Sequence, residues 1–274
     1  MSGRTVWFPG HMAKGTRKLE GLVGKLDLIL EVRDARAPEV TASPLAPSMS
    51  KICPVWKVLT KSDLADKKVT DAWLSLYRKG SGKAWAVDLL KGKIEPMRRE
   101  LLKASPSHRE LRLAVVGIPN VGKSALLNCL VGKKSASVGG IPGVTKGVSW
   151  YKGRGFLVVD SPGILDPKSD EHIQKALAWL GCSKAEVIGG YDAVSFRLVE
   201  FLLEKDLWYV VKDAWGVDLG EDPYETLESL GRRLGCLLPG NKVDFTLAGR
   251  RFLEAFSSGK LGAFSLERPG DLIG

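Results

Sequence analysis

A phosphate-binding pattern is the strongest chemical signal in this chain. Residues 117–124 read Gly-Ile-Pro-Asn-Val-Gly-Lys-Ser, which fits G-x-x-x-x-G-K-[ST]. The apolar run 111–116 before it predicts a buried strand, and residues 125–131 after it predict a helix that stops at Gly132. In this setting backbone N–H groups wrap phosphates and the helix N-terminus adds a favourable dipole. The residues expected to contact nucleotide phosphates are Asn120, Val121, Gly122, Lys123, Ser124 and Ala125.

A second segment has the residue types needed around a γ-phosphate. Asp160-Ser161-Pro162-Gly163 directly follows the apolar run 156–159, which is a predicted strand. A carboxylate at a strand end can hold Mg²⁺ through water, and the Gly163 N–H can reach the γ-phosphate. By itself this tetrapeptide is also an ordinary turn signal. Its place after the phosphate loop favours a nucleotide switch.

The expected Mg²⁺ ligands come from three segments. They are the Ser124 hydroxyl, Asp160 and Thr145, which lies in the loop 139–146 between the two motifs. We expect Lys123 to neutralise the β- and γ-phosphates. Lys123 and Thr145 are therefore the catalytic candidates at the phosphate end.

Thr60-Lys61-Ser62-Asp63 has the pattern of a guanine-recognition motif, Asn/Thr-Lys-x-Asp. It ends the largely apolar run 52–59, so it is predicted at the carboxyl end of a strand, where open α/β sheets bind nucleotides. The Asp63 carboxylate can accept hydrogen bonds from guanine N1–H and the exocyclic amine, a donor pair that adenine lacks. The Lys61 stem can pack over the base. The alternative is a loop with a solvated lysine and an aspartate that begins a helix.

A second base-contacting loop is expected after the predicted strand 84–87. Asp88 and Leu89 occupy that place, although the usual Ser-Ala signature is missing. They complete the candidate nucleotide-binding residues, together with Thr60, Lys61, Asp63 and Gly163.

The base motif precedes the phosphate motif, the reverse of their order in ordinary GTPases. A circular permutation would leave the site intact. Predicted strands at 26–32, 52–59, 84–87, 111–116 and 156–159 alternate with helices near 69–77 and 94–102. This alternation predicts an α/β fold with a doubly wound, mostly parallel sheet. Residues 103–109 would then join the two positions that are the C-terminus and the N-terminus of a GTPase domain with the ordinary motif order.

After about residue 170 the strand signals give way to helical ones. Residues 222–225, Asp-Pro-Tyr-Glu, read as a capped helix start, and Phe245, Phe252 and Phe256 mark a last helix that ends near Gly259. We predict a permuted GTPase domain over 1–170 and a small, all-helical domain over 171–274. Its basic residues could bind RNA or simply face solvent: Arg232, Arg233, Arg250, Arg251 and Lys260. Because residues 160–163 form the last nucleotide motif, this switch would connect directly to the helical domain.

Several segments together resemble one known family. They are the opening Trp7-Phe8-Pro9-Gly10-His11-Met12-Ala13-Lys14, Asp34-Ala35-Arg36, the motif order, and Gly259-Lys260-Leu261-Gly262. The chain resembles the circularly permuted GTPases of the YlqF type, ribosome biogenesis GTPase A. The resemblance implies hydrolysis of GTP to GDP, a role in assembly of the large ribosomal subunit, and binding to ribosomal RNA or the subunit precursor.

The resemblance also implies roles for single residues. Asn120 matches an asparagine associated with K⁺ coordination beside the phosphates. His11 matches a histidine suspected of assisting hydrolysis, for which packing of the Trp-Phe-Pro-Gly turn is the alternative. The chain departs from the family where Thr60 replaces the usual asparagine.

Ile164 stands where many GTPases keep the glutamine that orients the attacking water. An isoleucine cannot hydrogen-bond water, so we expect slow hydrolysis alone and faster hydrolysis on the ribosomal particle. Two other functions stay open at this point. One is a P-loop kinase that uses ATP, which Asp63 disfavours, and the other is an RNA-binding scaffold with a structural nucleotide site.

Composition favours an anionic partner. The 274 residues carry a formal net charge of +10, which suits RNA phosphates. The four cysteines are widely spaced without metal-ligand spacing, which is typical of a reducing compartment. No apolar run approaches the length of a membrane span. We expect a cytoplasmic, monomeric protein with no membrane partner.

Overall fold

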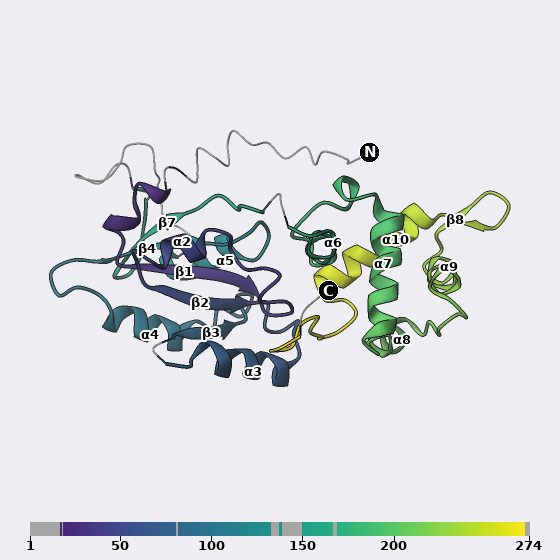
Figure 1. The fold of residues 1–274 in the computed structure, drawn as a ribbon, viewed down its shortest axis with the longest axis horizontal. Helices are drawn as coiled ribbons and strands as arrows, with labels where there is room; N and C mark the ends of the chain where they lie inside the picture. Colours follow the sequence, from purple (N-terminus) through teal and green to yellow (C-terminus); the bar gives the residue numbers. More distant parts are fainter. Residues whose placement is uncertain are drawn as a thin grey trace. The chain divides into compact units, whose positions relative to one another are not determined.

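A computed structural model describes residues 17, 19–80, 82–132, 137–138, 150–166 and 169–271 (Figure 1). The chain divides into two compact units. We call them the sheet unit, with described residues up to Asp166 together with 265–271, and the helical unit, residues 169–264.

The sheet unit contains a seven-stranded sheet in the order β3-β2-β1-β4-β7-β6-β5. Its parallel strands are β1 (Leu28–Asp34), β2 (Val55–Thr60), β3 (Ala84–Val87), β4 (Leu111–Val116) and β7 (Phe156–Asp160). All five predicted strands are confirmed, with shifts of one to three residues at some ends. The strands β6 (Trp150–Lys152) and β5 (Ser137–Val138) were not predicted and run antiparallel.

Helices cover the sheet because its strands are apolar on both faces. On one face, Ile29 and Val159 share a buried cluster with Met49 of α2 (Ala46–Met49) and with Val23 of η1 (Val23–Lys25). On the same face, Leu59 packs with Trp73 of α3 (Lys67–Tyr77). The helix α4 (Glu95–Lys103) covers the opposite face, where the Arg98 guanidinium lies 5.3 Å from the centre of the Phe156 ring. The helix α5 (Lys123–Val131) packs on β4 and β7.

The direction of chain winding reverses at the centre of the sheet. From β1 the chain adds β2 and β3 on one side, whereas β4 and β7 lie on the other side of β1. Ligands of open α/β sheets bind at such a switch point. Gly117 follows β4 here, and a Cβ atom at that position would lie 2.6 Å from the Val32 carbonyl oxygen. A glycine therefore permits the close approach of β1 to the loop after β4.

The helical unit is built from five α-helices among its described residues. They are α6 (Glu171–Trp179), α7 (Tyr191–Glu204), α8 (Tyr209–Trp215), α9 (Pro223–Arg233) and α10 (Phe245–Ser258), with the short η2 (Ala185–Val187). A hairpin of β8 (Leu237–Leu238) and β9 (Lys242–Val243) precedes α10. The predicted start of α9 is confirmed, because the Asp222 carboxylate accepts the Glu225 N–H at 2.8 Å. The last predicted helix is confirmed as α10, which ends at Gly259 with φ 78°.

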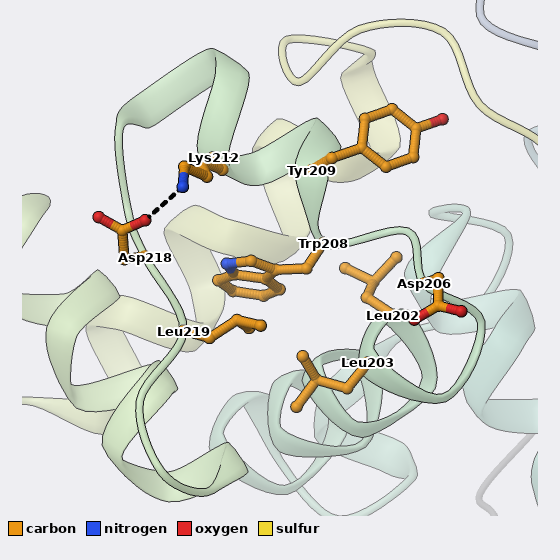
Figure 2. Close-up of a pocket in the computed structure, with 8 residues that line it drawn as sticks. All are labelled: Leu202, Leu203, Asp206, Trp208, Tyr209, Lys212, Asp218 and Leu219. Atoms are coloured by element: carbon orange, nitrogen blue, oxygen red, sulfur yellow. Dashed lines mark ion pairs between the residues drawn. The ribbon is translucent and has the colours of Figure 1, made fainter.

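The helical unit is closely packed at its centre and hollowed on its surface. Helices α7 and α10 approach so closely that a Cβ atom on Gly249 would lie 2.5 Å from the Tyr191 carbonyl oxygen. A hollow of about 440 Å³ lies beside Trp208, and Lys212 and Asp218 in its lining form an ion pair at 2.7 Å. Figure 2 shows the residues that line it. Trp208 itself is buried, and its indole N–H donates to the Val217 carbonyl at 3.0 Å.

Three observations on the described residues bear on the expectations from composition. All four cysteines are free thiols. Among the described residues, no helix combines the length and apolar character needed to cross a bilayer. The described residues also contain no cluster of three or more His, Cys, Asp or Glu side chains that could hold a metal ion.

The C-terminal segment differs from the predicted domain division. Residues 265–271 belong to the sheet unit, although the sequence placed everything after 171 in the helical domain. The reason is a buried glutamate: Glu267 is 3% exposed, and its carboxylate accepts the N–H groups of Glu39 at 2.8 Å and Val40 at 3.2 Å. Burial raises the pKa of Glu267 from 4.5 to about 7, and these two N–H groups oppose the shift.

This raised pKa predicts a pH-dependent stability. The folded state favours protonated Glu267, so its contribution is complete below pH 4.5 and is lost as the pH rises through about 7. We expect the free energy of unfolding of the native protein, relative to that of Glu267→Gln, to fall by up to about 3 kcal/mol over this interval. Urea unfolding of both proteins at pH 5, 6, 7 and 8 measures it. A difference in free energy of unfolding between the two proteins that stays constant from pH 5 to pH 8 would contradict the raised pKa of Glu267.

Candidate nucleotide-binding site

The predicted nucleotide motifs meet at one edge of the sheet. The strands β1, β2, β3, β4 and β7 are parallel, so their carboxyl ends lie along the same edge. Asp34 ends β1, Thr60 ends β2 and Asp160 ends β7, while the phosphate loop follows β4. Segments that are distant in sequence and permuted in order are thereby brought into one site.

The phosphate loop has the backbone expected of a phosphate cradle. Asn120 (φ 59°) and Gly122 (φ 99°) adopt left-handed conformations, and Gly122 is the N-cap of α5. Lys123 is buried, and its Nζ donates to the Ile118 carbonyl at 2.7 Å. Ser124 next to it is exposed. The N-terminus of α5 thus presents N–H groups, an ammonium group and an accessible hydroxyl, a combination that fits a polyphosphate.

The Asp160–Gly163 turn lies against this loop. A Cβ atom on Gly163 would lie 2.7 Å from the Pro119 nitrogen and 3.0 Å from Lys123 Nζ. Only a glycine allows the two backbones to come so close. The structure therefore places the Gly163 backbone beside the lysine expected at the γ-phosphate.

The charges and polar groups around Asp160 fit a magnesium ion. Desolvation raises the pKa of Asp160, and the nearby positive charge of Lys123 opposes the shift. The Oγ of Ser161 is buried and has no hydrogen-bond partner among the described residues. Mg²⁺ prefers hard oxygen ligands, and the Asp160 carboxylate with the Ser124 hydroxyl supplies this donor type.

Thr60 connects the base side of the site to the phosphate side. Its side chain is fully buried, and its hydroxyl lies within hydrogen-bonding reach of the Val121 carbonyl in the phosphate loop and of the Arg33 carbonyl, at 3.0 Å, in β1. The hydroxyl has one proton and therefore donates to one of them at a time. The threonine that replaces the family's usual asparagine thus still bridges β2 and the phosphate loop.

The base motif does not match the alternative of a plain helix start. Asp63 is exposed, and α3 is capped by Asp66, whose carboxylate accepts the Val69 N–H at 3.0 Å. Lys61 is not a freely solvated lysine, because it has left-handed φ (54°) and its Nζ lies 2.9 Å from Asp34 Oδ2. The Asp63 carboxylate is accordingly left available at the open edge of the sheet.

Asp34 is a site residue whose role the sequence did not predict. It is fully buried and accepts two hydrogen bonds from the Arg36 guanidinium, at 3.0 and 2.9 Å, in addition to the Lys61 ion pair. Burial alone would raise the pKa of Asp34, but the charges of Arg36 and Lys61 outweigh it and hold this pKa below its usual range. The carboxylate is therefore a fixed anion next to the base motif. Asp34-Ala35-Arg36 in the sequence was the available signal.

The Asp88 carboxylate is engaged within its own turn. Its carboxylate accepts the N–H groups of Leu90 at 3.1 Å and Lys91 at 3.2 Å, and it pairs with the Lys91 ammonium at 3.0 Å. The pKa of Lys91 is raised, mainly by Asp88 with a smaller contribution from Asp63. Asp88 thus shapes its own turn, and Lys91 is the charged neighbour of Asp63. The Leu89 carbonyl lies near Cys129 Sγ of α5, at 3.9 Å.

Three predicted residues need separate mention. His11 and Thr145 lie outside the described residues. Ile164 follows Gly163 and is half-buried. Its side chain offers no polar atom to water at the position where many GTPases have a glutamine.

Comparison with known proteins gives a consistent result. A family model described as a 50S ribosome-binding GTPase matches residues 112–194. Ribosome biogenesis GTPase A of Priestia megaterium is 34% identical over 97% of this chain and 97% of its own length. The protein of the same name from Thermotoga maritima is also 34% identical, over 97% of this chain and 95% of its own length.

Solved structures agree with the sequence relatives. GNP-bound YlqF from T. maritima superposes with a TM-score of 0.68 at 27% identity, covering 94% of this chain and all of that one. Its GDP-bound form gives a TM-score of 0.69 and covers 93% of this chain. The edge of the sheet where the permuted motifs converge, and the match over nearly the whole length, lead to one conclusion: the chain belongs to the ribosome biogenesis GTPase A family.

Proposed function

We propose that this protein is a GTP-hydrolysing switch that acts in assembly of the large ribosomal subunit. The observation that carries the proposal is the meeting of three elements at one sheet edge: the phosphate loop with Lys123, the Asp160–Gly163 segment and the exposed carboxylate of Asp63. The relatives named ribosome biogenesis GTPase A support the ribosomal role.

Each side chain has a distinct role in this proposal. Lys123 and the N–H groups from Asn120 to Ala125 hold the phosphates, and the Gly163 N–H reports the γ-phosphate. Ser124 and Asp160 hold Mg²⁺, which when bound neutralises charge that develops on the phosphates. Thr145 is proposed as a further Mg²⁺ ligand and Asn120 as a K⁺ ligand. Asp63 recognises guanine, and Thr60 keeps the base loop in register with the phosphate loop.

Hydrolysis by the protein alone is proposed to be slow. Ile164 offers no hydrogen bond to water, so the attacking water lacks the partner that a glutamine provides in other GTPases. His11 is the candidate within the chain to orient this water. The ribosomal particle is the proposed source of further acceleration.

The charge distribution points to the sheet unit as the main RNA-binding part. Residues 167–264 contain 12 Lys and Arg against 15 Asp and Glu, so the whole positive excess lies in the rest of the chain. Three arginines of the helical unit are engaged within it: Arg232 with Glu228, Arg250 with Glu254, and Arg251 with the Leu234 carbonyl. If the helical unit binds RNA through these arginines, they must leave their present contacts or share them with the RNA. We further propose that the protein works as a monomer in the cytoplasm.

Guanine selectivity is predicted to depend on Asp63. In Asp63→Asn the amide cannot accept from both guanine donors, so GTP affinity should fall about 100-fold, while the affinity for XTP, which has a carbonyl in place of the amine, should rise. Equilibrium competition against a fluorescent GDP measures both. Asp71→Asn is the matched control, because Asp71 is an exposed aspartate of α3 outside the base motif, and this variant should bind GTP normally. Unchanged GTP affinity in Asp63→Asn would remove Asp63 from the site.

Activation by the ribosome is a separate prediction. Steady-state GTP turnover should be slow for the free protein and should rise at least about 10-fold with large subunits or their precursors, because these supply the missing catalytic group. Lys123→Ala should abolish turnover in both conditions, since it removes the ammonium at the phosphates. Equal turnover with and without the particles would contradict this activation.

A further inference from the structure

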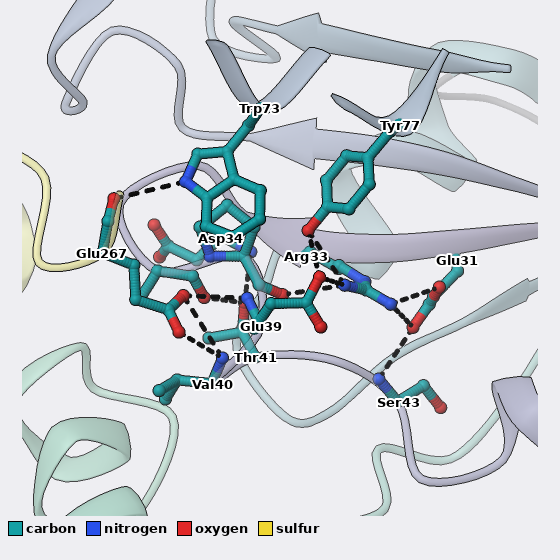
Figure 3. Close-up of polar contacts among 12 residues, drawn as sticks. Glu31, Arg33, Asp34, Glu39, Val40, Thr41, Ser43, Trp73, Tyr77 and Glu267 are labelled. Atoms are coloured by element: carbon teal, nitrogen blue, oxygen red, sulfur yellow. Dashed lines mark hydrogen bonds and ion pairs between the residues drawn. The ribbon is translucent and has the colours of Figure 1, made fainter. Parts of the chain in front are cut away.

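The segment 265–271, which we call the C-terminal strap, joins the loop that follows β1. The N–H groups of Leu266 and Glu267 donate to the Arg36 carbonyl at 2.8 and 3.3 Å. The Glu267 carboxylate accepts from Glu39 and Val40 further along the same loop, as Figure 3 shows. The strap is therefore hydrogen-bonded to both ends of the loop 35–41, at Arg36 near the start of the loop and at Glu39 and Val40 near its end.

The strap is also held on its other side by α3. The Trp73 indole N–H donates to the Glu267 carbonyl at 3.2 Å (Figure 3), and the Asp66 N–H donates to Ser265 Oγ at 3.1 Å. Leu266 and Glu267 are 5% and 3% exposed. A short stretch of chain thus fills the space between α3 and the loop 35–41 and contacts both with specific hydrogen bonds.

The loop 35–41 carries the group that fixes the base motif. The Arg36 carbonyl accepts hydrogen bonds from the strap, and the Arg36 guanidinium donates to the Asp34 carboxylate. Asp34 in turn forms an ion pair with Lys61 at 2.9 Å. At the other end of the loop, Thr41 Oγ1 accepts the Asp34 N–H at 2.9 Å and donates to the Ala37 carbonyl at 2.7 Å. A continuous series of hydrogen bonds connects Glu267 to Lys61.

We propose that Glu267 is a positioning residue of the guanine site. It fixes the loop 35–41, the loop fixes the Asp34 carboxylate, and Asp34 holds the Lys61 ammonium so that the lysine stem stays over the base. This inference rests on the guanine site proposed above. It assigns to the end of the chain a contribution to nucleotide retention.

The connectivity of the chain adds a consequence. The helical unit is inserted between the Asp160–Gly163 switch segment, which ends the first part of the sheet unit at Asp166, and the strap. It is therefore tethered to the phosphate side of the site by one end and to the base side by the other. A partner that draws the strap away from the loop 35–41 would loosen the guanine nucleotide and speed its release.

The test is a double-mutant cycle on nucleotide release. Stopped-flow dissociation of N-methylanthraniloyl-GDP is measured for the full-length native protein, Glu267→Ala, Lys61→Met and the double variant. Lys61→Met keeps the apolar stem and removes the ammonium that Asp34 holds. We expect Glu267→Ala to speed release about 10-fold in the native background and less than about 2-fold in the Lys61→Met background, since contacts acting through one another are not additive.

Controls separate positioning from a general loss of structure. Arg268→Ala changes the exposed neighbour of Glu267 and should release the nucleotide at the native rate. If Glu267→Ala does not fold, Glu267→Gln takes its place at pH 8, because it keeps the side-chain shape and one acceptor oxygen. A smaller acceleration that again disappears in Lys61→Met is then expected.

Two results would overturn the inference. One is release from the Glu267 variant at the native rate, and the other is the same acceleration in both backgrounds, which would show that the strap acts only through overall stability. Failure of the native protein to bind the labelled GDP at all would instead overturn the guanine site, and the inference with it.

Discussion

The parallel pairing of β1 with β4 is the constraint on which the rest of the structure depends. Glu31 stands opposite Val116, so the end of β1 extends beside the start of the phosphate loop. This places the buried Asp34 carboxylate on one side of the switch point and the phosphate cradle on the other. Gly117 is required because β1 passes so close. The nucleotide site is a consequence of this central pairing, whichever strand comes first in the chain.

That geometry explains why the permuted order does no damage to the site. Parallel strands present their carboxyl ends at one edge whatever their sequence order, so the base motif can precede the phosphate motif. Permutation does change which segment each motif leads into. Here the Asp160–Gly163 turn is followed by the helical unit, and the chain after that unit returns to the loop 35–41 on the base side.

Local patterns predicted the parts of the fold that local forces determine. The strands β3 and β4 have the predicted bounds because each is an apolar run with polar or glycine neighbours, and α9 begins where Asp222 and Pro223 indicated. The strand β6 was missed because Trp150–Lys152 is too short to show a period. Phosphate-loop geometry was predictable since its glycines and lysine form one contiguous motif.

The features that the sequence did not predict depend on contacts that the local pattern of residues does not show. A glutamate near a chain end is normally solvated, and nothing adjacent to Glu267 indicates that it will be buried against Glu39 and Val40. The place of Asp88 after β3 also did not predict that its carboxylate accepts the N–H groups of its own turn. Position after a strand predicts that a residue lies near the site, whereas the direction of its side chain depends on competing local hydrogen bonds.

The central claim is that one guanine nucleotide is held by segments from the whole length of the permuted chain, including its end. Hydrogen exchange of the full-length protein with and without a non-hydrolysable GTP analogue and Mg²⁺ tests this claim most directly. We predict increased protection of backbone N–H groups in four segments together: 60–63, 117–125, 160–163 and 265–271. Protection limited to 117–125, with the base motif and the strap unchanged, would contradict it.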